Sequence, residues 1–226
     1  EQDANFLISK GVKMIVVACN TASAFAIEHL RDVLPVPVLG VIEPGVQTAL
    51  QETRGGRVGV IATLGTVTSE RYQNLLADEI GSERVAALPC PLFVPLVEEG
   101  MTDHDITRRV VEEYLAGLRG EVDTLILGCT HYPLLKDVIG EYMGPDVRLV
   151  DSAEALATAA EAELRERGLA RNDDAGTGGM EFWLSDLPWK FQEVGARFLG
   201  RTIDDVHTVN LNEAHWDERL ARKEDQ

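Results

Sequence analysis

The sequence predicts an α/β protein made of two similar α/β domains with mainly parallel sheets, related by an approximate two-fold duplication. Apolar runs of strand length alternate with segments of helical period, which is the pattern of a parallel sheet with crossover helices. Several runs are rich in Val, Ile and Leu without polar alternation, as expected for strands covered on both faces. Two of them end alike, in a small residue, a cysteine and a hydrogen-bonding pair, which indicates a duplicated plan.

Eight strands are expected in chain order, each a short apolar run bounded by turn signals. They lie at residues 13–18, 36–41, 57–62, 84–88, 124–128, 147–150, 180–184 and 206–211. Helices are expected between them, because these segments have helical period and recognisable ends. Residues 69–80 stop at Gly81, residues 103–118 stop at Gly120, and Asp151 is expected to cap the helix that follows it.

In the helix at residues 103–118, four residues recur at intervals of four and are expected to face the core: Ile106, Val110, Tyr114 and Leu118. Residues 41–45 are expected to form a stiff turn where the chain crosses between domains, with a second crossing near Asp151. The first domain would then hold residues 1–43 and 151–226, the second residues 44–150, and the active site the cleft between them. The charged tail at residues 212–226 predicts a surface helix or disorder.

The composition is that of a folded chain that binds neither nucleic acid nor membrane. The 226 residues are 45% hydrophobic, enough for one large core or two small ones. A formal net charge of −17 argues against a nucleic-acid partner, because duplex binding depends on basic side chains. The apolar runs fall short of the roughly 20 residues that cross a bilayer, and no charged-then-apolar leader opens the chain.

Three scattered cysteines fit a reducing compartment, for which the cytoplasm is the default, better than a disulfide framework. A zinc site would need about four ligands at short paired spacings, whereas only His131 lies close to a cysteine, so no metal is expected. Cys90 stands between two prolines without polar companions and is expected to pack in a core.

Cys19 and Cys129 directly follow expected strands, at the sheet edge where open α/β proteins bind ligands. A helix N-terminus at this edge favours a thiolate, and its free N–H groups can hold a carboxylate. Each cysteine is also followed by two polar residues that could take part in the same site. These are Asn20, Thr21, Thr130 and His131.

Two thiols on facing sheets would approach one carbon from opposite sides. One, as thiolate, removes a proton while the other delivers a proton to the opposite face, so the configuration inverts without a cofactor. For either cysteine alone, inert packing is the plainer interpretation, since cysteine is among the most buried residue types. The polar neighbours argue against it, because an inert buried thiol has no need of side chains that must themselves be hydrogen-bonded.

Residues 18–23 (Ala-Cys-Asn-Thr-Ala-Ser) and 128–135 (Gly-Cys-Thr-His-Tyr-Pro-Leu-Leu) closely resemble the two cysteine motifs of the glutamate racemase family, within the aspartate/glutamate racemase superfamily. The likeness covers almost the whole chain, including residues 90–100, 150–154 and 182–186. It implies cofactor-independent inversion at the α-carbon of glutamate, which supplies D-glutamate for bacterial peptidoglycan, in a protein that is commonly a homodimer. Relatives acting on aspartate or hydantoins usually lack the Thr-His-Tyr-Pro continuation.

The resemblance also implies roles for individual residues. Cys19 and Cys129 would be the acid/base pair, His131 would assist Cys129, and Glu98 would be a nearby assisting carboxylate, with its neighbour Glu99 as the alternative. The substrate would be held by polar side chains of both domains, namely Asn20, Thr21, Thr63, Thr66, Thr130 and His131. Plainer alternatives are a turn residue for His131, loop caps for the second-domain threonines and a solvated carboxylate for Glu98.

Two motifs that precede the first cysteine in the family, Asp-Ser-Gly and Pro-Tyr-Gly, do not occur in this sequence. By the resemblance they belong to two strands of the first domain and carry an acid that assists the first cysteine and a serine that contacts substrate. We therefore expect the first domain to be incomplete and this 226-residue chain to be impaired or poorly stable as a racemase. Equal turnover by a version with the upstream residues restored would contradict this.

Two rival functions stay open. The first is an enzyme on another acidic amino acid such as aspartate, which solvent deuterium entry at the α-carbon of each amino acid would distinguish. The second is a non-catalytic binding protein that keeps the cleft without the chemistry. Ligand binding without isotope exchange, compared with Cys19→Ser and Cys129→Ser variants, would favour that second function.

Overall fold

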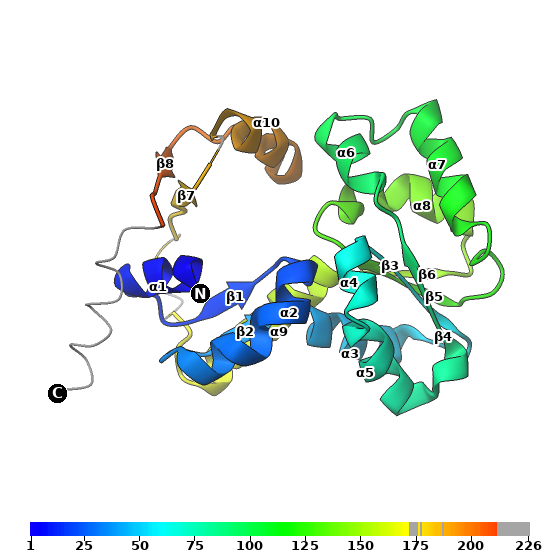
Figure 1. Ribbon diagram of the computed structural model, residues 1–226, viewed down its shortest axis with the longest axis horizontal. Helices are drawn as coiled ribbons and strands as arrows, with labels where there is room; N and C mark the ends of the chain where they lie inside the picture. Colours follow the sequence, from blue (N-terminus) through cyan, green and yellow to red (C-terminus); the bar gives the residue numbers. More distant parts are fainter. Residues whose placement is uncertain (172–175, 177, 187, 212–226) are drawn as a thin grey trace.

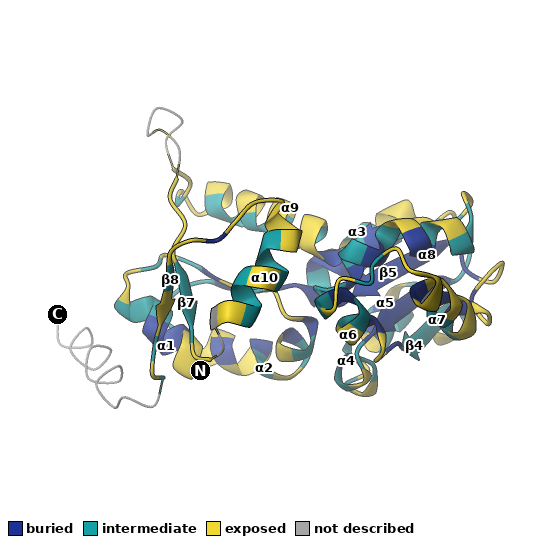
Figure 2. Ribbon diagram, turned by 90° about the horizontal axis from the view of Figure 1, so that it is seen from above, coloured by how far each residue is buried: buried dark blue, intermediate teal, exposed yellow. Residues whose placement is uncertain are grey.

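The computed structural model describes residues 1–171, 176, 178–186 and 188–211. Two parts lie side by side along its long axis (Figures 1 and 2). The larger part is built on a four-stranded sheet, and the smaller part holds two sheets of two strands each. All strand pairs in the three sheets are parallel, which confirms the predicted α/β class. The tail at residues 212–226 lies outside the described residues.

The eight expected strands are all present, and their bounds differ from the expected ones by no more than three residues. They are β1 (Ile15–Val17), β2 (Val38–Gly40), β3 (Val58–Ala62), β4 (Val85–Pro89), β5 (Thr124–Gly128), β6 (Arg148–Asp151), β7 (Phe182–Leu184) and β8 (Val206–Thr208). The prediction succeeded because most of these runs are apolar on both faces, a pattern that a surface helix does not show.

Helices fill the connections between the strands. They are α1 (Gln2–Ser9), α2 (Asn20–Val33), α3 (Ile42–Glu52), α4 (Leu64–Thr68), α5 (Arg71–Ile80), α6 (Phe93–Glu98), α7 (Asp105–Leu115), α8 (Lys136–Met143), α9 (Ser152–Glu166) and α10 (Pro188–Leu199), with 3-10 turns at Ser82–Arg84 and Tyr132–Leu135. Asp151 caps α9 as predicted, because its carboxylate accepts hydrogen bonds from the backbone N–H groups of Ala153 and Glu154.

The turn expected at residues 41–45 was wrong, because α3 begins at Ile42. Pro44 lies in the first turn of this helix, where its missing N–H group would have no helical partner in any case. The sequence Glu-Pro-Gly therefore starts a helix here instead of bending the chain away from one.

The four-stranded sheet, in the order β4-β3-β5-β6, is covered on both faces. One face packs on α6, α7 and α8, and its buried strand residues are Ile61, Leu125 and Leu127. The other packs on α3, α5 and α9, and its buried strand residues are Val58, Val60, Ile126 and Val150. Neighbouring residues of one strand thus enter different cores, as the two-residue period of a strand requires. Figure 2 shows the resulting dark, buried centre of this part.

The packing predicted for α7 was wrong at Ile106. The helix buries Thr107, Val111 and Leu115, whereas Ile106 is 50% exposed. Thr107 can lie inside because its hydroxyl donates a hydrogen bond to the carbonyl oxygen of Met101. Of the other expected core residues, Leu118 is buried in the core as predicted, just beyond the end of the helix, and Val110 and Tyr114 pack against that core while partly buried.

The smaller part has a thinner core. Parallel strands β1 and β2 are covered by α2, and the buried residues are Ala4, Ile15, Ile27, Leu30 and Val38. The ring of Phe6 on α1 packs edge-on against Trp183 on β7, with centroids 5.1 Å apart, and so ties the second two-stranded sheet to the first. Less of this part is buried, as Figure 2 shows.

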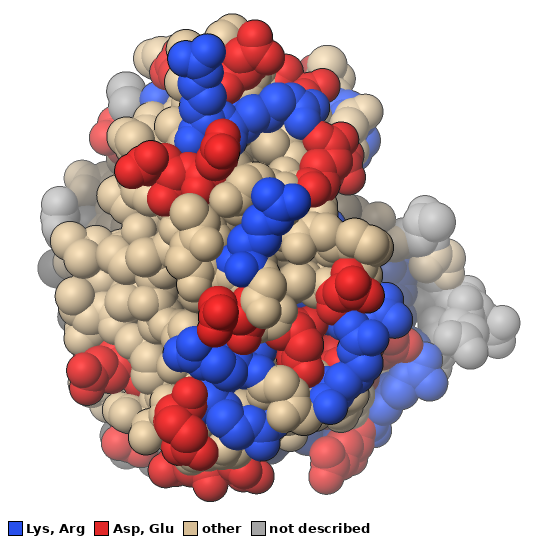
Figure 3. Space-filling view, turned by 90° about the vertical axis from the view of Figure 1, so that its right-hand side faces the viewer, with Lys and Arg blue, Asp and Glu red and all other residues tan. Residues whose placement is uncertain are grey.

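An ion pair and a hydrogen bond join helices of the two parts. Arg71 on α5 pairs with Glu28 on α2 and, at 3.2 Å, with Glu43 on α3. Arg197 on α10 donates a hydrogen bond of 2.7 Å to the carbonyl oxygen of Glu98 on α6. On the face of the larger part shown in Figure 3, basic side chains lie beside acidic ones.

In the described part of the chain, each helix falls short of the length and apolar content of a membrane span.

Candidate active site

Cys19 lies where the sequence predicts it, between strand β1 and the start of helix α2. It is the N-cap of this 14-residue helix, and its sulfur accepts a hydrogen bond of 3.4 Å from the backbone N–H of Ala22. The residue is exposed. Cys19 therefore places its sulfur at the N-terminal end of α2, on the surface of the protein.

Cys129 directly follows strand β5, at the same edge of its sheet, but is buried, with 7% of its surface exposed. Burial raises the pKa of its thiol to about 11, and charge on Cys19 raises it further, whereas hydrogen bonds from the backbone of His131 and Tyr132 and from Thr130 lower it. The thiol of Cys129 is therefore protonated at neutral pH. The influence of Cys19 also means that the two sulfurs lie within electrostatic reach of each other.

Cys90 packs in the core as predicted. It is fully buried between α6 and the sheet, and burial raises the pKa of its thiol to about 12. Among the residues that the structure describes, no three His, Cys, Asp or Glu side chains are grouped as metal ligands would be. Cys90 is therefore a packing residue of the core and is not grouped with Cys19 and Cys129.

His131 stands between Cys129 and a carboxylate on another helix. Its Nδ1 atom is 3.9 Å from the sulfur of Cys129, and its Nε2 atom is 3.4 Å from Oε1 of Glu98 on α6. Glu98 is thus the carboxylate beside His131, whereas Glu99 ends the helix and is exposed. The arrangement can pass a proton from the sulfur to the imidazole and stabilise the resulting positive charge.

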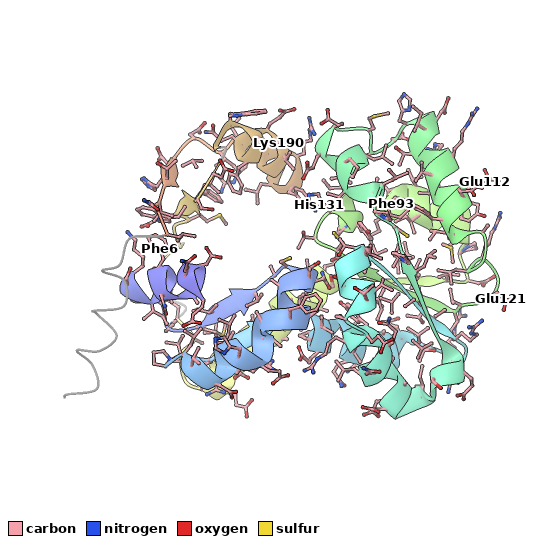
Figure 4. All side chains as sticks on the ribbon, viewed as in Figure 1. Phe6, Phe93, Glu112, Glu121, His131 and Lys190 are labelled. Carbon is pink, nitrogen blue, oxygen red and sulfur yellow. The ribbon has the colours of Figure 1, made fainter. Side chains whose placement is uncertain are left out.

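Helix α10 supplies partners for this group that the sequence analysis missed. Nζ of Lys190 is 3.0 Å from Oε2 of Glu98, and Figure 4 shows Lys190 and His131. Lys190 holds the pKa of Glu98 below its usual range, more strongly than burial raises it, and His131 adds to this effect. The ring of Phe198 meets His131 edge-on, with centroids 5.9 Å apart. Neither residue has a motif around it that would have indicated such contacts.

Three threonine hydroxyls from two helices meet in one cluster. The Oγ1 atom of Thr21 on α2 is 2.8 Å from that of Thr63 and 3.0 Å from that of Thr66, and the last two are 3.1 Å apart. Thr63 is also the N-cap of α4, because its hydroxyl accepts from the backbone N–H of Thr66. Thr63 therefore both caps α4 and belongs to the hydroxyl cluster. Three hydroxyls this close can turn their donors toward an anion.

Asn20 and Thr130 differ in how they are placed. The side chain of Asn20 is buried and accepts a hydrogen bond of 2.7 Å from the hydroxyl of Tyr72. Thr130 is half-buried, with its hydroxyl 3.5 Å from Nδ1 of His131. The structure thus brings Thr130 to the group around His131, while Asn20 lies beneath the surface beside Cys19.

A cavity of about 670 Å³ opens beside His131. Its polar lining comes from Glu98, Thr130, His131 and Lys190, and α10 contributes most of its apolar lining. A larger cavity, about 1020 Å³, is lined mainly by α3, α8 and α9 and includes none of the predicted site residues. The smaller cavity is therefore bordered by the side chains beside Cys129, although its lining includes neither Cys129 nor Cys19.

Each of the two parallel α/β parts carries a cysteine at the carboxyl end of a strand. The protein is thus a two-part α/β protein with paired cysteines. The family model described as Asp/Glu/hydantoin racemase matches residues 2–160. A glutamate racemase of Geobacter metallireducens is 49% identical over 209 residues, which are 92% of this chain and 77% of that protein. The chain therefore belongs to the Asp/Glu/hydantoin racemase family.

Solved structures agree with this assignment. A glutamate racemase isoform of Bacillus anthracis superposes with a TM-score of 0.86 at 35% identity, over 92% of this chain and 77% of that one. The glutamate racemase of Francisella tularensis, solved in complex with D-glutamate, gives a TM-score of 0.84 at 35% identity, over 93% of this chain and 78% of that one.

Proposed function

We propose that this protein is an isomerase that interconverts L-glutamate and D-glutamate, and so supplies D-glutamate for peptidoglycan. The observation that carries the proposal is similarity to glutamate racemases over 92% of the chain. Two cysteines at strand ends, close enough for the charge of one to act on the other, support it independently. The reaction is an inversion at the α-carbon.

In the proposed mechanism, one sulfur removes the α-proton as thiolate and the other donates a proton to the opposite face of the carbon. The electron pair of the broken C–H bond forms the new one, and both sulfurs end with their protonation states exchanged. Cys129, kept protonated by a pKa of about 11, is ready to donate. Cys19, exposed and with its sulfur accepting a hydrogen bond from the N–H of Ala22, is the partner that takes the proton.

For the opposite enantiomer, Cys129 must first lose its proton. His131 is the group placed to take it, with Nδ1 3.9 Å from the sulfur, and Glu98 lies 3.4 Å from the other ring nitrogen to stabilise the imidazolium. We propose that the hydroxyls of Thr21, Thr63, Thr66 and Thr130, with Asn20, hold the carboxylates and ammonium of the substrate. Both proton carriers are side chains, so the exchange requires no cofactor.

The domain division, oligomeric state and location are further proposals. Separate sheets support a first domain of residues 1–43 with 151–226 and a second of residues 44–150. Leu156 on α9 packs in a core of the larger sheet, which puts α9 at the joint between them. A homodimer is proposed from the family resemblance, and a cytoplasmic protein without a nucleic-acid partner from the cysteine usage and the net charge of −17.

The proposed substrate is tested by incubating the protein separately with L-glutamate and L-aspartate and separating the enantiomers on a chiral column. We expect D-glutamate to approach an equal mixture with L-glutamate, and D-aspartate to form at least about a hundredfold more slowly. Faster formation of D-aspartate would contradict the choice of substrate. Formation of neither product, with glutamate still bound, would favour the binding-protein alternative.

A further inference from the structure

A fully buried tyrosine lies between the two cysteine motifs. Tyr72 on α5 donates a hydrogen bond of 2.7 Å to Oδ1 of Asn20, the residue after Cys19. Burial raises the pKa of Tyr72 well above its usual range, so its hydroxyl keeps the proton that this bond uses. The contact joins helix α5 to the first turn of helix α2.

The hydrogen bond from Tyr72 also sets the orientation of the Asn20 amide. With Oδ1 facing the tyrosine, Nδ2 faces the hydroxyl of Ser152 on α9 at 3.5 Å. Ser152 in turn donates a bond of 2.9 Å to the carbonyl oxygen of Leu127, two residues before Cys129. This buried chain of bonds therefore runs from α5 through the Cys19 motif to the strand that ends at Cys129.

Tyr72 is also held by steric contacts with two glycines. A Cβ atom built on Gly128, the residue before Cys129, would lie 3.3 Å from Cε2 of Tyr72 and 3.0 Å from the carbonyl oxygen of Ile61. A Cβ atom on Gly45 of α3 would lie 3.2 Å from the tyrosine oxygen. Tyr72 thus occupies a slot between two glycines, which fixes where its hydroxyl can be.

We propose that Tyr72 is a positioning residue for the reaction, because its ring is seated on Gly128 beside Cys129 while its hydroxyl orients Asn20 beside Cys19. This inference rests on the proposed racemase function. Tyr72 has no contact with substrate in this role and acts through Asn20. Without the hydroxyl, the buried oxygen of Asn20 would have no donor, and the first turn of α2 with Cys19 would shift to regain one.

The test is Tyr72→Phe, which removes the hydroxyl and keeps the ring in its slot. We expect kcat/KM for glutamate to fall about tenfold, because a small displacement of a reacting group costs much of the rate. Tyr114→Phe is the matched control, since it removes a tyrosine hydroxyl from the backbone N–H of Leu92 on the far side of the larger sheet, where Tyr114 packs on Phe93. It should retain kcat/KM within about twofold.

Isotope effects separate positioning from a general loss of folded protein, because they do not depend on the concentration of active enzyme. With glutamate deuterated at the α-carbon, Tyr72→Phe should raise the isotope effect for the enantiomer that Cys19 deprotonates and lower it for the other. Isotope effects equal to those of the parent for both enantiomers would overturn the proposal.

A double-mutant cycle tests whether Tyr72 acts through Asn20. In an Asn20→Ala background the hydroxyl no longer has an amide to orient and keeps Ser152 as a side-chain partner, so Tyr72→Phe should change kcat/KM by less than about twofold. A tenfold loss in both backgrounds would overturn the proposal. If the parent makes no D-glutamate, the racemase function fails, and a crystal structure of Tyr72→Phe decides the positioning claim alone. Displacement of the Asn20 amide from Ser152 would support it, and an unmoved amide would refute it.

Discussion

The two cysteine motifs look alike in the sequence and differ in the structure. Cys19 is exposed at the end of a two-stranded sheet and caps a helix of 14 residues, whereas Cys129 is buried at the end of a central strand of the four-stranded sheet. The sulfur of Cys129 has a histidine within 3.9 Å. One sulfur therefore lies at a helix N-terminus open to solvent, and the other lies in the interior with a proton acceptor beside it.

The largest expected effect comes from removing either sulfur. We expect Cys19→Ser and Cys129→Ser each to lower kcat/KM for glutamate by about a thousandfold, because a hydroxyl is a far weaker acid and its conjugate base is hardly populated at neutral pH. Turnover is measured by the formation of the opposite enantiomer.

Cys90→Ala is the control for these two substitutions, because Cys90 is buried in the core and has no polar companion among the site residues. It should keep kcat/KM within about twofold while lowering the free energy of unfolding by about 1 kcal/mol. A racemase that tolerates serine at position 19 or 129 as well as it tolerates alanine at position 90 would break the paired-sulfur account.

Alkylation by iodoacetamide, followed by peptide mass mapping, measures the difference in exposure between Cys19 and Cys129. At pH 8 we expect Cys19 to react about a hundredfold faster than Cys129, because Cys129 is buried and its pKa is about 11 instead of 9.0. The rate at Cys129 should keep rising as the pH increases toward 11. Equal rates at the two cysteines would show that Cys129 is as accessible as Cys19.

A smaller effect is expected from the carboxylate beside His131. Glu98→Gln should lower kcat/KM by about tenfold, because a neutral amide stabilises the imidazolium less well than a carboxylate does. The neighbouring substitution Glu99→Gln should leave kcat/KM within about twofold, since Glu99 is exposed at the end of the helix. If the two variants behave alike, Glu98 has no part in the chemistry at Cys129.

The smallest effect on catalysis is expected at the opposite end of the Cys129 strand. Asp123 precedes β5, and although burial tends to raise its pKa, hydrogen bonds from Gly56, Thr53, Thr124 and Arg54 outweigh burial and lower it. Asp123→Asn should lower the free energy of unfolding by about 1–2 kcal/mol with little change in kcat.

The pH dependence of that stability follows from the lowered pKa of Asp123. Its contribution is fully present above the unfolded pKa of about 3.9 and is lost as the pH falls through the lower folded pKa. The difference in urea-unfolding stability between the parent and Asp123→Asn should therefore shrink steadily as the pH falls below about 3.9. A stability difference that stays constant down to pH 2 would contradict this origin.

Most of the fold was predictable because local sequence determines it. Strand β5 is buried throughout, and its apolar run from Leu125 to Leu127 predicted a strand covered on both faces, while the polar residues after it indicated a site at its end. The packed face of α7 was missed because Thr107 looks polar in sequence and becomes buried through its bond to Met101. The start of α3 was missed because Pro44 is a turn signal unless it falls in a first helical turn.

The sequence could predict which residues in the motifs belong to the site, but not how these residues are arranged. Cys19, Cys129 and His131 stand in recognisable segments, but their different burial depends on how many strands and helices surround each sheet. Lys190 and Tyr72 approach the site from distant helices, one facing Glu98 and the other Asn20. Such contacts depend on tertiary packing, and neither residue carries a local pattern that indicates them.

The direct test of the paired sulfurs is where deuterium enters when L-glutamate is racemised in deuterium oxide. If one sulfur removes the proton and the other delivers a second one, deuterium should appear early in D-glutamate, while the remaining L-glutamate keeps its protium. Mass spectrometry of the separated enantiomers at about 5% conversion measures this. Early deuterium in both enantiomers, or in neither, would contradict an exchange of protons between two sulfurs across one carbon.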